Sequence, residues 1–167
     1  MGIIETRVVQ KAVFQAVGMQ ILWKPEAGNP SGNQLSKLWG EFSPRIEEIS
    51  HSVPSKKYGL ERFKPGFKQG DPIEYTACSE VTEIGEIPEG MTGIEVPAAT
   101  YAVITYEGTI DGINSVYGHF WQNWLPQSKE YEAAGGWNFE YYDERFFGNA
   151  NPESIYEVWF PVKAKQG

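Results

Sequence analysis

Apolar positions recur at two different periods along this chain, and the two periods alternate. Residues 11–23 are rich in strand-forming side chains, and residues 33–49 carry apolar side chains at steps of three and four, which is typical of an amphipathic helix. Residues 57–63 and 73–84 are again strand-like, and a segment rich in glycine and proline separates them. The first half of the chain therefore predicts the order strand, helix, strand, strand.

The second half predicts the same order. A strand is expected over residues 96–106, followed by a turn and then a helix with a clean apolar stripe from Ile113 to Trp124, which Pro126 ends. Further strands are expected over residues 138–147 and 154–163. A β-α-β-β order that occurs twice predicts an α+β fold, with two main helices packed on a mostly antiparallel sheet.

The two predicted helices also share a sequence pattern. Six apolar or small positions recur in spacing and character 78 residues later: Leu35, Leu38, Trp39, Gly40, Phe42 and Ile46 match Ile113, Val116, Tyr117, Gly118, Phe120 and Trp124. A shorter match aligns residues 58–63 with residues 141–146. We interpret the chain as one domain of two pseudo-symmetric modules, at about 1–86 and about 90–167. A cleft between such modules is a common place for a small-molecule pocket.

The start of the first predicted helix and the effect of Pro44 near its end depend on the residues around them. Residues 24–32 contain two prolines and two glycines, so they are expected to form a loop that ends at Asn33 as the helix cap. Pro44 then lies inside the apolar run. Either it kinks the helix, or Ser43 caps a second short segment that has Pro44 in its first position.

Charge and composition exclude several classes of protein. The chain of 167 residues has a formal charge of −8 and no cluster of Lys or Arg, so direct nucleic-acid binding is not expected. One cysteine, Cys78, and two histidines, His51 and His119, provide neither an internal disulfide nor a zinc ligand set. We expect no metal and no cofactor, while the acidic balance favours cationic partners.

The N-terminal residues indicate neither a signal peptide nor a membrane span, because no long apolar run occurs there. A cytoplasmic protein with no membrane contact is expected. The first six residues match the loose acylation pattern M-G-x-x-x-[ST], which arises easily by chance. The sequence leaves the oligomeric state open.

Four motifs resemble one known family: residues 96–103 (VPAATYAV), 124–128 (WLPQS), Phe139-Glu140-x-Tyr142, and 160–163 (FPVK). Their order and spacing are similar to those of the GyrI-like, or bacterial transcription-activator effector-binding, domains. The resemblance implies two related βαββ modules about a pseudo-two-fold axis. The chain differs from many such proteins in its long first loop and in lacking an attached helix-turn-helix, so it looks like a stand-alone member.

The resemblance also implies a function and a principal site residue. Members of this family take up amphipathic, aromatic and often cationic compounds in the cleft, with a carboxylate among aromatic rings. Glu140 occupies the matching place here, and Tyr142 leaves the same face of the predicted strand two residues later. Rings would supply apolar area and cation-π attraction, and the acid would supply charge.

The other candidates for the pocket wall are aromatic, and each also has a simple structural interpretation. Tyr75 and Tyr106 lie on predicted strands and face either the cleft or the core. Trp39 and Trp124 fall on the apolar helix stripes, where packing is the default role. Alternation on the last strand places Tyr156 on one face and Trp159 on the other. The candidate ligand-binding residues are thus Glu140, Tyr142, Tyr75, Tyr106, Trp124, Tyr156, Trp159 and Trp39.

Two other functions remain open at this point. Some proteins similar to this family hydrolyse strained, alkylating cyclopropane compounds with a pocket glutamate, and Glu140 with Glu157 would be the catalytic candidates here. The family is also named after a gyrase inhibitor, and an acidic chain could present a phosphate-like surface to a DNA-binding enzyme. The spread of the charges disfavours that third function. The repeated Glu-Arg pairs at Glu61 and Glu144 are interpreted as structural.

Overall fold

The computed structural model describes residues 2–24, 32–63, 66–68 and 70–166. Within these residues the chain forms one nine-stranded sheet. None of the described helices is long and apolar enough to cross a membrane. The strands are β1 (Gly2–Lys11), β2 (Phe14–Trp23), β3 (Ser52–Phe63), β4 (Ile73–Val81), β5 (Thr92–Val96), β6 (Ala99–Glu107), β7 (Tyr131–Ala133), β8 (Gly136–Tyr142) and β9 (Ile155–Ala164). The predicted α+β class is confirmed.

The strand order reflects the duplication seen in the sequence. The order across the sheet is β1-β6-β9-β8-β3-β4-β2-β5, with β7 added on β9, and all these pairs are antiparallel. From the central pair outward, β3, β4 and β2 mirror β8, β9 and β6. The outer strands are exchanged between the halves, because β1 pairs with β6 and β5 pairs with β2.

Three strands were not predicted, and some of the predicted strands extend too far, since β4 ends at Val81 rather than at Ile84. β1 and β5 are edge strands whose side chains are largely half-buried or exposed, so they lack a clear apolar pattern; β7 is only three residues long. Residues 11–23 contain the end of β1 and all of β2, so they are not the first strand. β8 ends at Tyr142 rather than at Phe147, because Arg145 turns back to bond Asp143.

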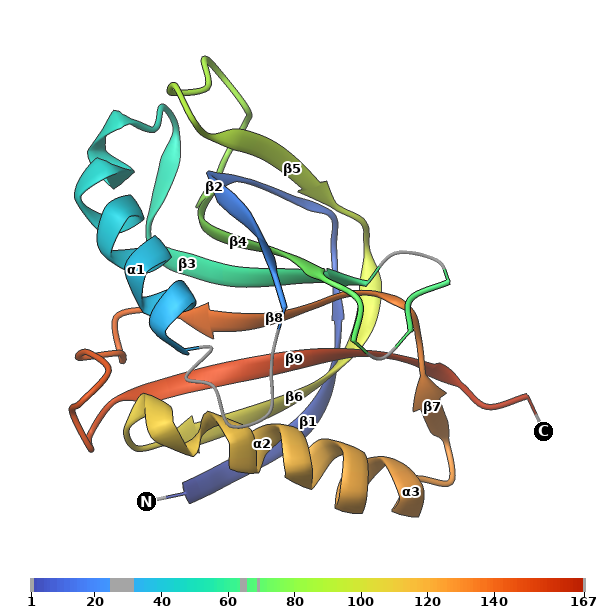
Figure 1. Ribbon diagram of the computed structural model, residues 1–167. Coiled ribbons are helices and arrows are strands. Elements are labelled where there is room, and N and C mark those ends of the chain that lie inside the picture. Colours follow the sequence, from blue (N-terminus) through green and yellow to red (C-terminus); the bar gives the residue numbers. More distant parts are fainter. Residues whose placement is uncertain (1, 25–31, 64–65, 69, 167) are drawn as a thin grey trace.

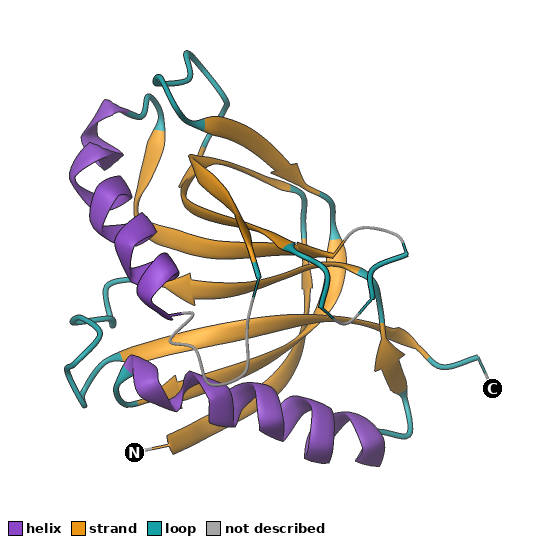
Figure 2. Cartoon of the chain, viewed as in Figure 1, coloured by secondary structure: helices purple, strands orange, loops and turns teal. Residues whose placement is uncertain are grey.

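The helices pack on one face of the sheet, here called the helix face (Figures 1 and 2). Helix α1 (Gly32–Phe42) covers β2 and β4, burying Leu38 and Phe42 against Val17 and Ala77. A second helix begins at η2 (Ile110–Gly112) and continues through α2 (Ile113–His119), a π segment (Phe120–Trp124) and α3 (Leu125–Gln127). It covers β6 and β9. Because each helix covers its own half, the central strands β3 and β8 stay open between them.

The end of α1 decides between the two interpretations of Pro44. The chain continues from Phe42 into a separate 3-10 segment (Ser43–Glu48) that has Pro44 in its first turn, and Phe42, not Ser43, is the cap residue. A second short segment is therefore correct, and the cap assignment is wrong. α1 begins at Gly32, one residue before Asn33. The capping side chain proposed there, and most of the preceding loop, lie outside the described residues.

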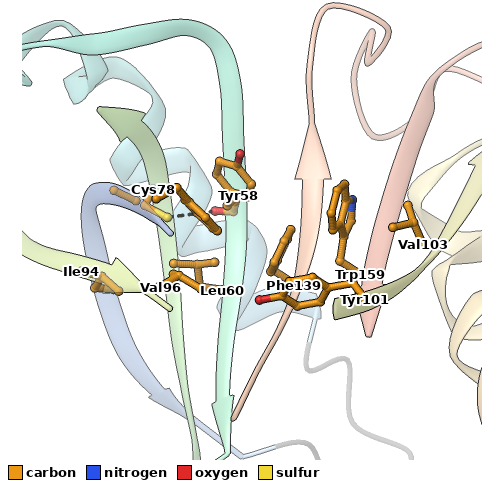
Figure 3. Packing of buried hydrophobic residues seen from close by; sticks show 11 residues of the cluster. Tyr58, Leu60, Cys78, Ile94, Val96, Tyr101, Val103, Phe139 and Trp159 are labelled. Atoms are coloured by element: carbon orange, nitrogen blue, oxygen red, sulfur yellow. Dashed lines mark hydrogen bonds between the residues drawn. The ribbon is translucent and has the colours of Figure 1, made fainter. Parts of the chain in front are cut away.

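The opposite face of the sheet holds an aromatic cluster that joins both modules (Figure 3). Tyr58, Phe139 and Trp159 form its centre, with Phe139 stacked on Trp159 at 5.3 Å between ring centroids. Side chains from β2 and β5 at one edge and from β6 near the other meet in this one cluster, which requires the sheet to curl around it. The residues of β3 and β8 that alternate with this cluster leave the helix face of the sheet.

Candidate functional site

A cavity of about 1140 Å³ lies on the helix face, between α1 and α2 and above the central strands. This volume can hold a drug-sized molecule. Its walls are mainly aromatic, with contributions from β2, α1, β3, β4, α2 and β8: Trp23, Trp39, Phe63, Tyr75, Tyr117 and Tyr142. The cavity thus lies at the junction of the two modules, where the sequence predicts a cleft.

Glu140 lies in the floor of this cavity and is 6% exposed. Its Oε1 accepts hydrogen bonds from the Tyr75 hydroxyl at 2.8 Å and the Tyr142 hydroxyl at 2.9 Å. The Trp39 indole N–H donates in turn to the Tyr75 hydroxyl at 2.9 Å, so α1 is tied to the carboxylate through β4. Within the described residues no hydrogen bond is made to Oε2, which leaves that oxygen available to a ligand.

A glycine on the neighbouring strand makes room for this carboxylate. Gly59 pairs directly with Glu140 across β3 and β8, and a Cβ atom at this position would come within 2.6 Å of Glu140 Oε1 and into overlap with the Tyr75 hydroxyl. We expect Gly59→Ala to disrupt the Tyr75–Glu140 hydrogen bond and to lower both the melting temperature and ligand affinity. Thermal melting and binding assays measure the two effects.

Gly118→Ala is the matched control for that substitution. Gly118 lies in α2, and a Cβ atom there would have nothing within 4 Å. Since alanine is favoured over glycine in a helix by roughly 0.5–1 kcal/mol, this variant should be slightly more stable than the parent chain. A Gly59→Ala protein as stable as Gly118→Ala would contradict the steric argument.

A second buried acid, Glu61, lines the same cavity. It is 4% exposed, and its Oε1 accepts a hydrogen bond from the Tyr117 hydroxyl of α2 at 2.8 Å. Glu61 pairs across the strands with Asn138, two residues before Glu140. Glu61 and Glu140 are therefore diagonal neighbours on one face of the sheet, a relation that places residues roughly 7–8 Å apart and their Cβ atoms somewhat closer.

The sequence-based alignment of Glu61 with Glu144 as corresponding residues of the repeat is wrong. Glu144 is an exposed turn residue beyond the end of β8, whereas Glu61 is buried in β3. Leu60 pairs with Phe139 at the centre of the sheet, so these two residues correspond in the two modules. The residue after each is a glutamate, and Glu140 therefore corresponds to Glu61, 79 residues earlier. This offset is close to the 78 residues that relate the helices, which is the signal that could have identified Glu61.

Burial and the absence of a basic partner destabilise both charges. Desolvation raises the pKa of Glu61, and the nearby charge of Glu140 raises it further. Desolvation also raises the pKa of Glu140, although the hydrogen bonds from Tyr75 and Tyr142 oppose this shift. Lys57 lines the cavity, but among the described residues neither acid forms an ion pair.

The tyrosines around the acids remain hydrogen-bond donors. Desolvation, followed by the nearby glutamate charges, raises the pKa of the Tyr75, Tyr117 and Tyr142 hydroxyls well above the usual value. These hydroxyls therefore stay protonated at physiological pH. Each can stabilise a carboxylate by donating to it, but none can neutralise its charge.

Among the described residues, two fully buried polar atoms of the lining have no hydrogen-bond partner. They are the indole nitrogen Nε1 of Trp23 and the amide oxygen Oδ1 of Asn138, both buried. Buried polar atoms are nearly always paired in folded proteins, so each marks a place where a bound molecule could complete the hydrogen bonding. Among the described residues no group of His, Cys, Asp or Glu has the arrangement of a metal site.

The structure brings together four of the candidate ligand-binding residues, namely Glu140, Tyr142, Tyr75 and Trp39. Tyr156 lies one layer behind them, where its ring packs against Tyr142 and its hydroxyl bonds the Thr109 carbonyl. The remaining three, Tyr106, Trp124 and Trp159, also lie outside the cavity lining. Trp23, Tyr117, Glu61 and Asn138 are lining residues that sequence reasoning did not select.

Local packing explains these placements. Tyr106 lies beside Gly112, where its hydroxyl fills the space that a Cβ atom would need, and its ring packs at a tilt against Tyr156. Trp124 stacks between Phe120 and Tyr131.

Trp159 and Glu157 leave the opposite face of β9. The Trp159 indole donates to Glu157 Oε1 at 2.9 Å, and Arg145 and Arg7 bond Glu157 Oε2 at 3.0 and 3.3 Å. Glu157 pairs with Tyr141, the neighbour of Glu140 in sequence, so the two glutamates point to different faces of the sheet. The pairing of Glu140 with Glu157 as catalytic residues is therefore ruled out by geometry.

Comparison with known proteins now identifies the family. The model of the GyrI-like small molecule binding domain matches residues 5–163. This chain belongs to that family. The transcriptional regulator BrlR of Pseudomonas aeruginosa is 33% identical to it over 161 residues, which are 93% of this chain and 54% of BrlR. The chain thus spans about half the length of this curated relative.

Solved structures share the fold of this GyrI-like domain at low sequence identity. SAV2435, solved bound to tetraphenylphosphonium, has a TM-score of 0.71 at 16% identity, covering 96% of this chain and 94% of that chain. The C-terminal domain of EcmrR has a TM-score of 0.67 at 14% identity, covering 95% and 97%. The fold predicted from the sequence resemblance is confirmed.

Proposed function

We propose that this GyrI-like domain captures lipophilic organic cations between its two modules. The observation that carries the proposal is the pair Glu61 and Glu140, buried in an aromatic cavity with no basic side chain bonded to either among the described residues. A buried carboxylate without a cation is costly by several kcal/mol. A cationic ligand would supply the missing charge, and the aromatic walls would add cation-π attraction of roughly 0.5–2 kcal/mol.

The comparisons support this proposal. SAV2435 has a similar fold and was solved with a lipophilic cation, tetraphenylphosphonium. BrlR is a transcriptional regulator, so we infer that ligand capture by this domain serves a regulatory output. Burial of ~300 Å² of apolar ligand surface is worth at most about 7 kcal/mol before association costs. Micromolar affinity and broad selectivity are therefore expected, because most of the contacts are non-directional.

The test compares three aromatic probes of similar shape and different charge. Tetraphenylphosphonium is cationic, triphenylphosphine oxide is neutral and tetraphenylborate is anionic. A ligand that prefers the native state raises the melting temperature by mass action, so the cation should stabilise the domain most. Glu140→Gln should weaken tetraphenylphosphonium about tenfold or more in calorimetry and leave triphenylphosphine oxide within about twofold.

Trp159→Phe is the matched control. It changes an aromatic residue of the opposite face, outside the cavity lining, so affinity for the cation should be retained. An equal loss of the cationic and the neutral probe in Glu140→Gln would contradict the charge argument, as would a preference of the parent chain for tetraphenylborate.

Hydrolysis is a second candidate function, and the same carboxylates favour it. A glutamate whose pKa is raised by burial can act as a general base toward water, and the cavity holds two such residues, Glu61 and Glu140. They replace the pair that includes Glu157. Incubation with a strained, cyclopropane-containing alkylating compound should then consume it faster with the parent chain than with Glu140→Gln. Equal rates with and without protein would exclude this activity for that compound class.

A further inference from the structure

The two acids of the cavity have different surroundings. Glu140 is surrounded by rings: the Tyr75 and Tyr142 hydroxyls donate to it, and the Trp39 indole donates to the Tyr75 hydroxyl. Glu61 instead lies beside a carboxamide, because Asn138 faces it directly across the paired strands. Desolvation raises the pKa of Glu61, and the Asn138 side chain opposes this shift, which agrees with a carboxamide that lies close to the carboxylate.

The amide oxygen of Asn138 has no hydrogen-bond partner among the described residues. Asn138 is 5% exposed, lines the cavity, and its Oδ1 is buried and unpaired. A buried acceptor with no donor is unfavourable, and here it lies next to a carboxylate that also lacks a cation. Both deficits would be met by a single ligand group that carries positive charge and N–H donors.

We propose that Glu61 and Asn138 form a second subsite, selective for an N–H-bearing cation such as an amidinium, a guanidinium or a protonated amine. The inference rests on the proposed function, and it deepens that function by distinguishing two kinds of cationic group within one cavity. The aromatic surroundings of Glu140 suit a cation that has no donors, such as a phosphonium or a quaternary ammonium. Since the two acids are diagonal neighbours on β3 and β8, one extended ligand can place a different group at each.

Tyr117 completes the second subsite. Its hydroxyl donates to Glu61 Oε1 from α2, so this oxygen is held in place, and both Glu61 and Asn138 line the cavity. An amidinium presents two parallel N–H groups, which match a carboxylate oxygen and an amide oxygen side by side. A trimethylammonium group of the same charge has no N–H to offer and leaves Asn138 Oδ1 unpaired.

The experiment uses two monocations with the same biaryl body, 4-phenylbenzamidinium and 4-biphenylyl-trimethylammonium. The parent chain should bind the amidinium about tenfold more tightly in calorimetry. Asn138→Leu should weaken the amidinium about tenfold and leave the trimethylammonium compound within about twofold. Glu61→Gln should also weaken the amidinium more than its quaternary analogue.

A measurement on the parent chain avoids any folding defect of the variants. The side-chain N–H₂ signals of Asn138 in a ¹⁵N-correlated NMR spectrum should shift with the amidinium and stay in place with the quaternary compound. Equal affinities of the parent chain for the two probes, or an Asn138 signal that responds to neither, would overturn the second subsite. If tetraphenylphosphonium binding still depends on Glu140, only this subsite fails; if no cation binds better than tetraphenylborate, the proposed function fails as well.

Discussion

Replacing either cavity acid by its amide is expected to stabilise the unliganded protein at pH 8. Glu61 and Glu140 have raised pKa values in the folded chain, so the fold favours their protonated forms. Each unit by which a pKa is raised removes about 1.4 kcal/mol of stability once the group is ionised. Glu61→Gln and Glu140→Gln keep a hydrogen-bonding side chain and remove the charge. In a chain of this size each kcal/mol gained raises Tm by about 2–4 °C.

The pH dependence of this gain has a definite sign. An acid with a raised folded pKa binds more protons when folded than when unfolded, so stability falls as pH rises through the interval between the two values. The lower limit of the interval is the unfolded value, about 4.3. The gain of the Gln variants should therefore be small near pH 4 and increase toward pH 8. Thermal melting of the parent chain and both variants across this range measures it.

Glu157→Gln is the matched control, since Glu157 is also a buried glutamate but has the opposite electrostatics. It is 3% exposed and bonded by Arg7, Arg145 and Trp159. Removal of its charge should lower stability by about 1–2 kcal/mol. The argument for the cavity acids would be contradicted if all three Gln variants shifted the melting temperature in the same direction.

Much of the fold could be predicted from the sequence. The helices, the central strands and the antiparallel sheet were predictable, because apolar periodicity is strong where an element is buried on one face. β1 was missed because its side chains are half-buried or exposed, and β5 because it is only five residues long. The repeat itself predicted the cleft at the module junction, and family resemblance located Glu140 within it.

The individual lining residues were harder to predict. Alternation along a strand separates two sets of side chains, but it does not say which set faces a cavity; Tyr75 and Tyr106 therefore had equal claims. Two glycines determine where these tyrosines lie. Gly112 leaves space for the Tyr106 hydroxyl, and Gly59 leaves space for Tyr75 and Glu140. These contacts join residues far apart in the sequence, so they are visible only in the structure. Glu61 was missed because residues 58–63 were aligned with residues 141–146. That register matches Glu61 with Glu144 instead of Glu140.

Cation binding is expected to tighten strongly as pH rises. The unliganded cavity holds its acids with raised pKa values, and the positive charge of a ligand favours their ionised forms. Binding of tetraphenylphosphonium, which has no titratable group, should therefore release protons. Affinity can increase by as much as tenfold per pH unit for each proton released, in the interval above about pH 4.3 in which the acids of the free protein ionise.

Calorimetry in two buffers of different ionisation enthalpy counts the protons released at each pH. The tyrosine hydroxyls around Glu61 and Glu140 stay protonated through this range, because their pKa values are raised. Besides the two glutamates, the charged residues that line the cavity are Lys57 and Asp111. The double variant Glu61→Gln, Glu140→Gln keeps all of these groups. Its residual affinity should be nearly independent of pH, since only the two carboxylates link proton release to binding. An affinity of the parent chain that stays constant from pH 5 to pH 9 would show that neither acid changes its charge when the cation enters, and the electrostatic basis of ligand capture would then have to be abandoned.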